Sequence, residues 1–371
     1  MLQTSMLLRI ISTFWIIAKL ISINLWLDDR LYPLVPLFEY TETIPSIVHT
    51  LLFYSSITVL FSVLLFPKNI KLIILLLLLE LSSCILDVTR WQPWEYQYIF
   101  ILLIFILNRN NSRVIYNALI FILASIYIYS GFHKVNGGFL YTIWEQMMLR
   151  NFMGISNKTI IDNKLHYVGL ILPVIEILSG FGLLFLKNKR TPALVLITMH
   201  LFILLFIGPL GINHNMVVWP WNVAMIALLY ILFIKNSTLE YSLKTITKKW
   251  NLIVLLFWGI LPAFSFIGYW EHYLSSSLYS GNTVNMSICF KDKEDAKLFE
   301  PYLSNKDRYN VCNGESRLSL LHWAYTEMRV TPYPEVWYYK RFKEQYIKQY
   351  GKDKVRFIRY CYPYKELKEV E

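Results

Sequence analysis

Charged residues are scarce in this sequence. Only 16% of its 371 residues are Asp, Glu, Lys or Arg, while 56% are hydrophobic and the mean hydropathy is +0.42. Soluble domains carry about 25% charged residues, so the composition argues against a soluble protein. The apolar residues form runs long enough to cross a bilayer. The composition therefore predicts a polytopic membrane protein whose main partner is the lipid bilayer.

Cysteine is scarce too, because the chain has only four. They form neither a CxxC pair nor a zinc-binding spacing, so we predict no metal site. The net charge of +11 comes mostly from short loops and from the tail, which does not indicate nucleic-acid binding. The first apolar run lacks a small-residue cleavage site and is long enough to span, so no cleavable signal peptide is expected.

The apolar runs predict an all-α membrane bundle of about nine transmembrane helices. We assign residues 1–270 to this bundle and residues 271–371 to a small soluble domain. The predicted spans lie approximately at 7–26, 46–66, 71–87, 94–108, 114–132, 165–186, 193–211, 216–234 and 251–269. No internal repeat accompanies them, which argues against a carrier built from repeated halves.

The loops between these spans alternate in charge. Because basic loops stay in the cytoplasm, the pattern predicts a cytoplasmic N-terminus and an extracytoplasmic C-terminal domain, in a bacterial cell or inner membrane. The cytoplasmic loops are predicted to carry Lys68, Lys71, Arg109, Arg113, Lys187, Lys189, Arg190, Lys235, Lys244, Lys248 and Lys249. The opposite loops carry Asp28, Asp29, Glu39, Glu42, Asp87, Glu95 and the turn at His214.

The tail differs in composition from the rest of the chain. Alternating and amphipathic patterns predict strands at 283–290 and 355–362 and helices at 294–303 and 334–350, which together make an α+β domain. An extracytoplasmic location would allow a Cys289–Cys312 disulfide. The same domain would be available to bind an extracytoplasmic protein partner.

One stretch stands out, an apolar helix that ends in Tyr127-Ile-Tyr-Ser-Gly131-Phe-His133-Lys134. Tyr127, Gly131 and Lys134 are spaced i, i+4 and i+7, so they share one helix face. An amine at the membrane edge can act as a proton acceptor. Alternatively, Lys134 extends its charge to the interface and anchors the helix end.

Three ionisable groups fall in the interior of predicted spans, at membrane depth, namely Glu80, Glu176 and His200. Such groups are costly in a membrane and tend to be functional or paired. Glu176 shares a helix face with Gly169, Pro173 and Gly180, which is typical of close helix packing. Structural alternatives remain open, because a protonated Glu or a neutral His can simply bridge two helices.

A second group is predicted at the outer surface, on the same side as Lys134. It contains aromatic residues and the polar side chains of Asp87, Arg90, His214 and Asn222. Interfacial Trp residues usually mark the membrane boundary. Aromatic walls with a few polar groups would also suit a ring-shaped, membrane-soluble ligand such as a quinone.

The segment Tyr127 to Lys134, followed by Trp144, resembles the transmembrane domain of the vitamin K-dependent γ-carboxylase-like family, also called HTTM. The order of the later spans is similar, including the Gly-rich span that ends in Gly180-Phe-Gly182-Leu-Leu-Phe and the Met-His pair at His200. The resemblance implies that Lys134 is the base that deprotonates a vitamin K-like hydroquinone, with His200 in the pocket. Only about 100 residues (271–371) follow the last predicted span, which is short for a region that binds a substrate peptide.

A shorter resemblance involves the Pro-Glu-Gly span around Glu176, which is similar to small DoxX/MauE-type membrane proteins linked to quinone and thiol redox chemistry. Three hypotheses follow. The chain is a quinol-binding enzyme, with pocket residues Tyr127, His133, Glu176 and His200 around Lys134. It is a non-catalytic membrane scaffold that binds a partner through its tail. Or it is a DoxX/MauE-like redox accessory protein.

Overall fold

The computed structural model describes residues 2–236, 241–304, 307, 309–351, 355–364 and 366–370. It divides into two compact units. The first contains residues 1–20, 55–80 and 93–281, and the second contains residues 21–54, 81–92 and 282–371. The sequence boundary after residue 270 therefore lies near the division at 281. The N-terminal segments 21–54 and 81–92 join the second unit, which sequence did not indicate.

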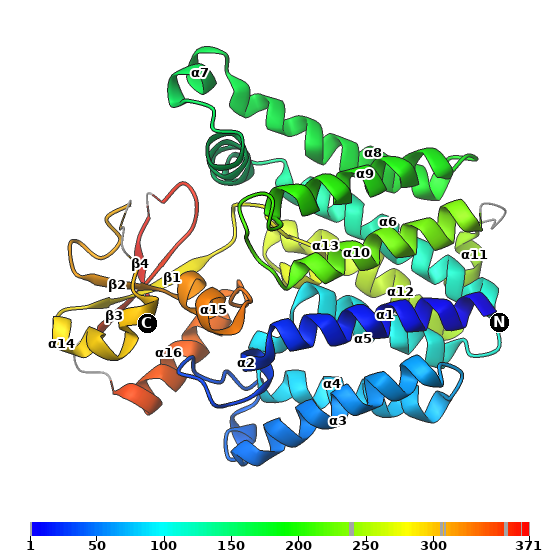
Figure 1. The fold of residues 1–371 in the computed structure, drawn as a ribbon, viewed down its shortest axis with the longest axis horizontal. Helices are drawn as coiled ribbons and strands as arrows, with labels where there is room; N and C mark the ends of the chain where they lie inside the picture. The colour runs from blue at the N-terminus through cyan, green and yellow to red at the C-terminus, as the bar shows by residue number, and fades with distance from the viewer. Residues whose placement is uncertain are drawn as a thin grey trace. The chain divides into compact units, whose positions relative to one another are not determined.

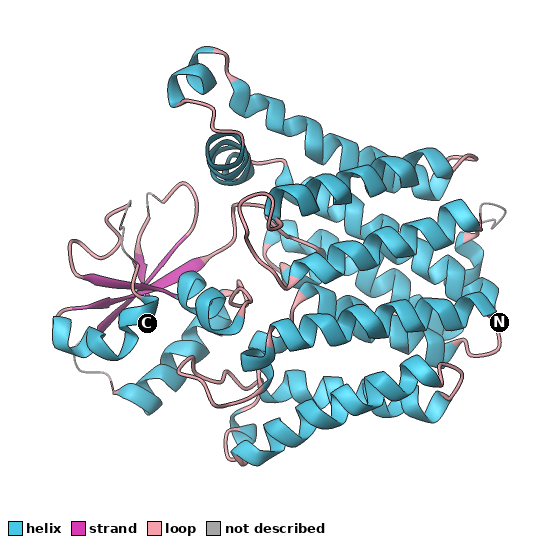
Figure 2. Cartoon of the chain, in the orientation of Figure 1, coloured by secondary structure: helices cyan, strands magenta, loops and turns pink. Residues whose placement is uncertain are grey.

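The first unit is helical, as Figures 1 and 2 show. Its longer helices, three of which include residues of the second unit, are α1 (Leu2–Ile21), α3 (Ser46–Leu65), α4 (Ile70–Leu86), α5 (Pro93–Leu107), α6 (Ser112–Lys134), α8 (Ile171–Phe185), α9 (Arg190–Ile207) and α10 (Val218–Leu229). Shorter pieces are η3 (Phe139–Phe152), which is π-helical, α7 (Asn157–Asp162), η4 (Leu165–Leu170), η5 (Tyr230–Lys235) and α11 (Leu243–Ile246). The last predicted span is broken into η6 (Lys249–Asn251), α12 (Leu252–Leu255), η7 (Leu256–Ile260), α13 (Leu261–Phe264) and η8 (Ser265–Ile267).

Seven helical segments of the described chain are long and apolar enough to cross a membrane, which is consistent with an integral membrane protein. Each of the nine predicted spans coincides with helix, but α4, with 17 residues, and α5, with 15, are shorter than the other seven. The number of crossings and the side on which each terminus lies stay predictions.

Helix α6 is the most buried of the seven membrane-length segments and packs against α8. Glycines allow this close packing. A Cβ atom on Gly131 would lie 2.6 Å from a side-chain carbon of Ile177 and 2.8 Å from the carbonyl oxygen of Pro173. A Cβ atom on Gly180 would lie 2.7 Å from a side-chain carbon of Ile128. The small residues on both helices therefore set the distance between α6 and α8.

The second unit contains a four-stranded antiparallel sheet in the order β2-β1-β3-β4. Figure 2 shows these strands in magenta. The strands are β1 (Asn285–Phe290), β2 (Ser316–Ser319), β3 (Val355–Tyr360) and β4 (Lys368–Glu369). Its helices are α2 (Ile23–Trp26), η1 (Glu39–Thr41), η2 (Val88–Arg90), α14 (Lys293–Ala296), η10 (Lys297–Tyr302), α15 (Leu320–Met328) and α16 (Val336–Tyr350), whereas η9 (Tyr273–Ser275) belongs to the first unit. The predicted elements coincide with β1, β3, α14 with η10, and α16.

The sheet carries the disulfide expected from sequence, between Cys289 of β1 and Cys312. Both cysteines are fully buried and pack with Val311, Ile358 and Tyr360. The bridge therefore joins the loop before β2 to β1, one of the two inner strands of the sheet.

Candidate functional site

Lys134, the last residue of α6, forms an ion pair with Glu176 of α8. Its Nζ lies 2.7 Å from both carboxylate oxygens of Glu176 and donates a further hydrogen bond of 2.6 Å to Oγ of Ser130. The side chains of Lys134 and Glu176 are only 12% and 6% exposed. The amine therefore does not extend into solvent, and its charge is balanced by a carboxylate on the neighbouring helix.

This pair forms the polar end of an otherwise apolar pocket. The pocket has a volume of about 100 Å³. Typical ligand pockets measure ~300–1,000 Å³, so this one holds a single ring or chain segment. Besides Lys134 and Glu176, its walls are Phe139, Ile143, Trp144, Met148, Leu172, Met199, Phe202, Ile203, Phe206, Ile207 and Tyr279.

Sequence reasoning missed most of these walls, although a signal was present. Met199, Phe202, Ile203 and Phe206 follow one face of α9 at helical spacing, and three of them are aromatic or sulfur-containing. This spacing equally fits a lipid-facing helix, so it did not distinguish a pocket wall.

A buried hydrogen-bond chain links Tyr127, His200 and Asn222. The amide of Asn222 donates to the carbonyl of Val218, which leaves its oxygen facing Nδ1 of His200 at 2.7 Å. Nδ1 must then carry the proton, so Nε2 of His200 accepts the hydrogen bond of 2.6 Å from the Tyr127 hydroxyl. The three predicted pocket residues are thus satisfied by one another.

His133 and His214 do not line the pocket of Lys134 and Glu176. The His133 ring stacks on Phe266, with centroids 4.3 Å apart, and its Nε2 lies 3.0 Å from the Ser265 hydroxyl. The His214 ring makes an edge contact with Tyr279 of the pocket wall, with centroids 6.5 Å apart. Burial lowers the pKa of His214, which favours its neutral form.

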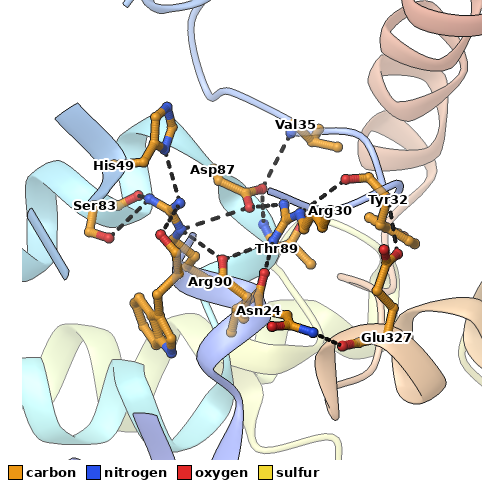
Figure 3. A network of polar contacts seen from close by, with 12 residues as sticks. Asn24, Arg30, Tyr32, Val35, His49, Ser83, Asp87, Thr89, Arg90 and Glu327 are labelled. Carbon is orange, nitrogen blue, oxygen red and sulfur yellow. Dashed lines mark hydrogen bonds and ion pairs between the residues drawn. The ribbon is translucent and has the colours of Figure 1, made fainter. Parts of the chain in front are cut away.

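Asp87 belongs to the second unit, where Figure 3 shows its contacts. Its fully buried carboxylate pairs with Arg30 and Arg90 and accepts hydrogen bonds from the backbone amides of Val35 and Thr89. Burial by itself raises the pKa of Asp87, but the two guanidinium groups outweigh this effect and hold the pKa below its ordinary value.

Arg90 is fully buried beside Asp87, also in Figure 3. Its guanidinium donates to the carbonyl oxygens of Leu25, Trp26 and Ser83, and one nitrogen lies 2.9 Å from Nδ1 of His49. Arg90 therefore satisfies carbonyl groups at the end of α2, where helical partners run out.

The same unit ties its N-terminal segments to the C-terminal domain. The Glu327 carboxylate accepts hydrogen bonds from the backbone amides of Leu31 and Tyr32, at 2.6 and 2.9 Å. The hydroxyl of Tyr338 contacts those of Tyr32 and Thr89 at 3.1 and 2.9 Å. Asp87 and Arg90 thus take part in a structural network, separate from the pocket of Lys134.

Comparison with family models, curated proteins and solved structures finds no match for the chain. Assignment of function therefore depends on the geometry of the residues themselves.

Proposed function

We propose that the chain is a membrane protein that binds a ring-shaped, membrane-soluble molecule of the quinol class in the pocket of Lys134 and Glu176. One observation carries the proposal, namely a buried ammonium–carboxylate pair at the end of an apolar pocket with aromatic walls. Such a pair can donate to a ring carbonyl and accept from a ring hydroxyl, while the apolar walls hold the ring.

The ion pair decides how a proton could move. In the pair, Lys134 is an ammonium with no lone pair to accept a proton, whereas Glu176 is a carboxylate acceptor. A quinol hydroxyl would therefore donate first to Glu176. Lys134 can serve as a base only after it has passed its own proton to Glu176. We propose that the two residues act as one base, which extends the role that the family resemblance implies for Lys134 alone.

The test is an equilibrium titration of the detergent-purified protein with a short-chain benzoquinol, whose single ring matches the volume of the pocket. The substitutions Lys134→Met and Glu176→Gln each remove one half of the pair. Hydrogen bonds to charged groups contribute about 1.5–3 kcal/mol, so affinity should fall by about 10- to 100-fold in both variants. Lys158→Met is the matched control, because Lys158 lies exposed on α7 and outside the pocket.

If quinol binds equally well to the parent and to Lys134→Met, the pair is not the binding group. Failure of the parent to bind would instead favour the non-catalytic scaffold. In that case, deletion of the tail should abolish function while Lys134→Ala has no effect.

A further inference from the structure

A second group of ionisable side chains lies in the first unit and takes no part in the quinol pocket. Lys19 of α1, Glu80 of α4 and Glu95 of α5 are all fully buried. Charges removed from water are costly unless each is paired and hydrogen-bonded. Their partners therefore show which charges this site can hold.

Lys19 and Glu80 form the paired part of the group. Nζ of Lys19 lies 2.7 Å from Oε2 of Glu80, and the hydroxyl of Ser56 on α3 donates to Oε1 of the same carboxylate. Each oxygen of Glu80 thus has a donor, as an ionised carboxylate requires.

Glu95 is different, because only one of its oxygens has a donor in the described chain. Its Oε2 accepts a hydrogen bond of 2.7 Å from the indole Nε1 of Trp15. Its Oε1 is buried without a hydrogen-bond partner. Glu80 and Lys19 are the charged groups that act on it, and Tyr98 is the titratable neighbour on its own helix. An ionised Glu95 would place two negative charges and one positive charge in a fully buried site.

A single proton would remove both the unpartnered acceptor and the excess negative charge. On Oε1 of Glu95, it would turn the unpartnered acceptor into a donor and leave one carboxylate facing one ammonium. Two carboxyl groups that share a site in this way commonly hold one proton between them. We propose that Glu95 and Glu80 form a proton-binding site inside the helical unit, with Lys19 as its fixed counter-charge.

The proposal places the proton on Glu95 and the negative charge on Glu80, so matched amide substitutions of the two residues test it. In Glu95→Gln, the amide copies a protonated acid, since it accepts from Trp15 and donates toward Glu80. This variant should fold with the Tm of the parent. In Glu80→Gln, the ammonium of Lys19 loses its counter-charge, and the Tm should fall. Glu39→Gln, at an exposed position, is the control.

Infrared spectroscopy of the detergent-solubilised protein reads the proton directly. At neutral pH the parent should show the C=O band of a protonated carboxyl group, shifted after transfer to D₂O. This band should be lost in Glu95→Gln and unchanged in Glu39→Gln. An unchanged band in Glu95→Gln would overturn the proposal, and so would a Glu95→Gln protein that misfolds or melts as early as Glu80→Gln. Because none of these residues lines the quinol pocket, the result is independent of the proposed function.

Discussion

At the scale of single residues, partners decide what each ionisable side chain can do. Lys134 and Glu176 have opposite charges and face an apolar pocket, which leaves them available to a ligand. Asp87 and Arg90 have their hydrogen-bonding capacity taken up by backbone groups and by one another. The first pair is therefore the stronger candidate for chemistry, and the second pair for stability.

Asp87→Asn should destabilise the second unit, because it leaves Arg30 and Arg90 without their buried carboxylate. Loss of one member of a buried ion pair costs about 3–5 kcal/mol. The effect should depend on pH. The pKa of Asp87 is lowered in the folded state, so its contribution is complete above the unfolded pKa of about 3.9 and is lost as the pH falls through the lower, folded value.

Thermal unfolding in detergent at neutral pH and in acid measures this contribution. The Tm difference between the parent and Asp87→Asn should be large at neutral pH and should shrink below about pH 4. Asp29→Asn is the control, because Asp29 is an exposed acidic residue of the same unit. A Tm difference that stays constant down to the lowest pH would contradict the account.

The sequence identified several of these residues but not their partners. The sequence points to both Lys134 and Glu176, yet these residues lie 42 positions apart on different helices, so no local pattern predicts their contact. Lys19 lay unnoticed near the end of an apolar run, and Glu95 was grouped with loop charges. Both become informative only when α1, α4 and α5 are assembled.

At the scale of helices and strands, the pattern of apolar runs predicts where most of the helices lie. It does not predict how far each helix is enclosed by protein, as α5 shows. With 15 residues and nearly every side chain buried, α5 is enclosed by protein and can be short. In the second unit, β2, β4 and α15 were missed, because segments of two to nine residues carry too little periodicity.

Gly131→Val tests the contact between α6 and α8. The new side chain would collide with Ile177 and with the backbone of Pro173, which forces the helices apart. Overpacking of this kind costs about 1–3 kcal/mol, so the Tm in detergent should fall. Leu178→Val is the control on α8, where Leu178 is 66% exposed. Equal Tm values for Gly131→Val and the parent would show that the helices are not packed as described.

At the scale of the whole molecule, the chain combines apolar helices long enough to span a membrane with a disulfide-linked α+β unit. The positive charges in alternate loops predict that this second unit faces away from the cytoplasm. The disulfide between Cys289 and Cys312 agrees with an oxidising environment.

Cys361 provides a direct probe of this orientation, because it is a free, exposed cysteine of the tail, whereas the free Cys84 is buried. A membrane-impermeant maleimide added to intact cells should label the parent but not Cys361→Ser. Labelling of Cys361 only after the membrane is permeabilised would place the tail in the cytoplasm and reverse the predicted topology.

The central claim is that the pocket of Lys134 and Glu176 takes a quinol ring, and the benzoquinol titration tests it most directly. Substitution of Ile203 by Trp sharpens the measurement, because the larger side chain would fill the pocket of about 100 Å³ while both charged residues stay in place. The account predicts saturable binding to the parent and to Lys158→Met, with binding weakened in Lys134→Met and lost in Ile203→Trp. Equal affinity for the parent and Ile203→Trp would contradict it.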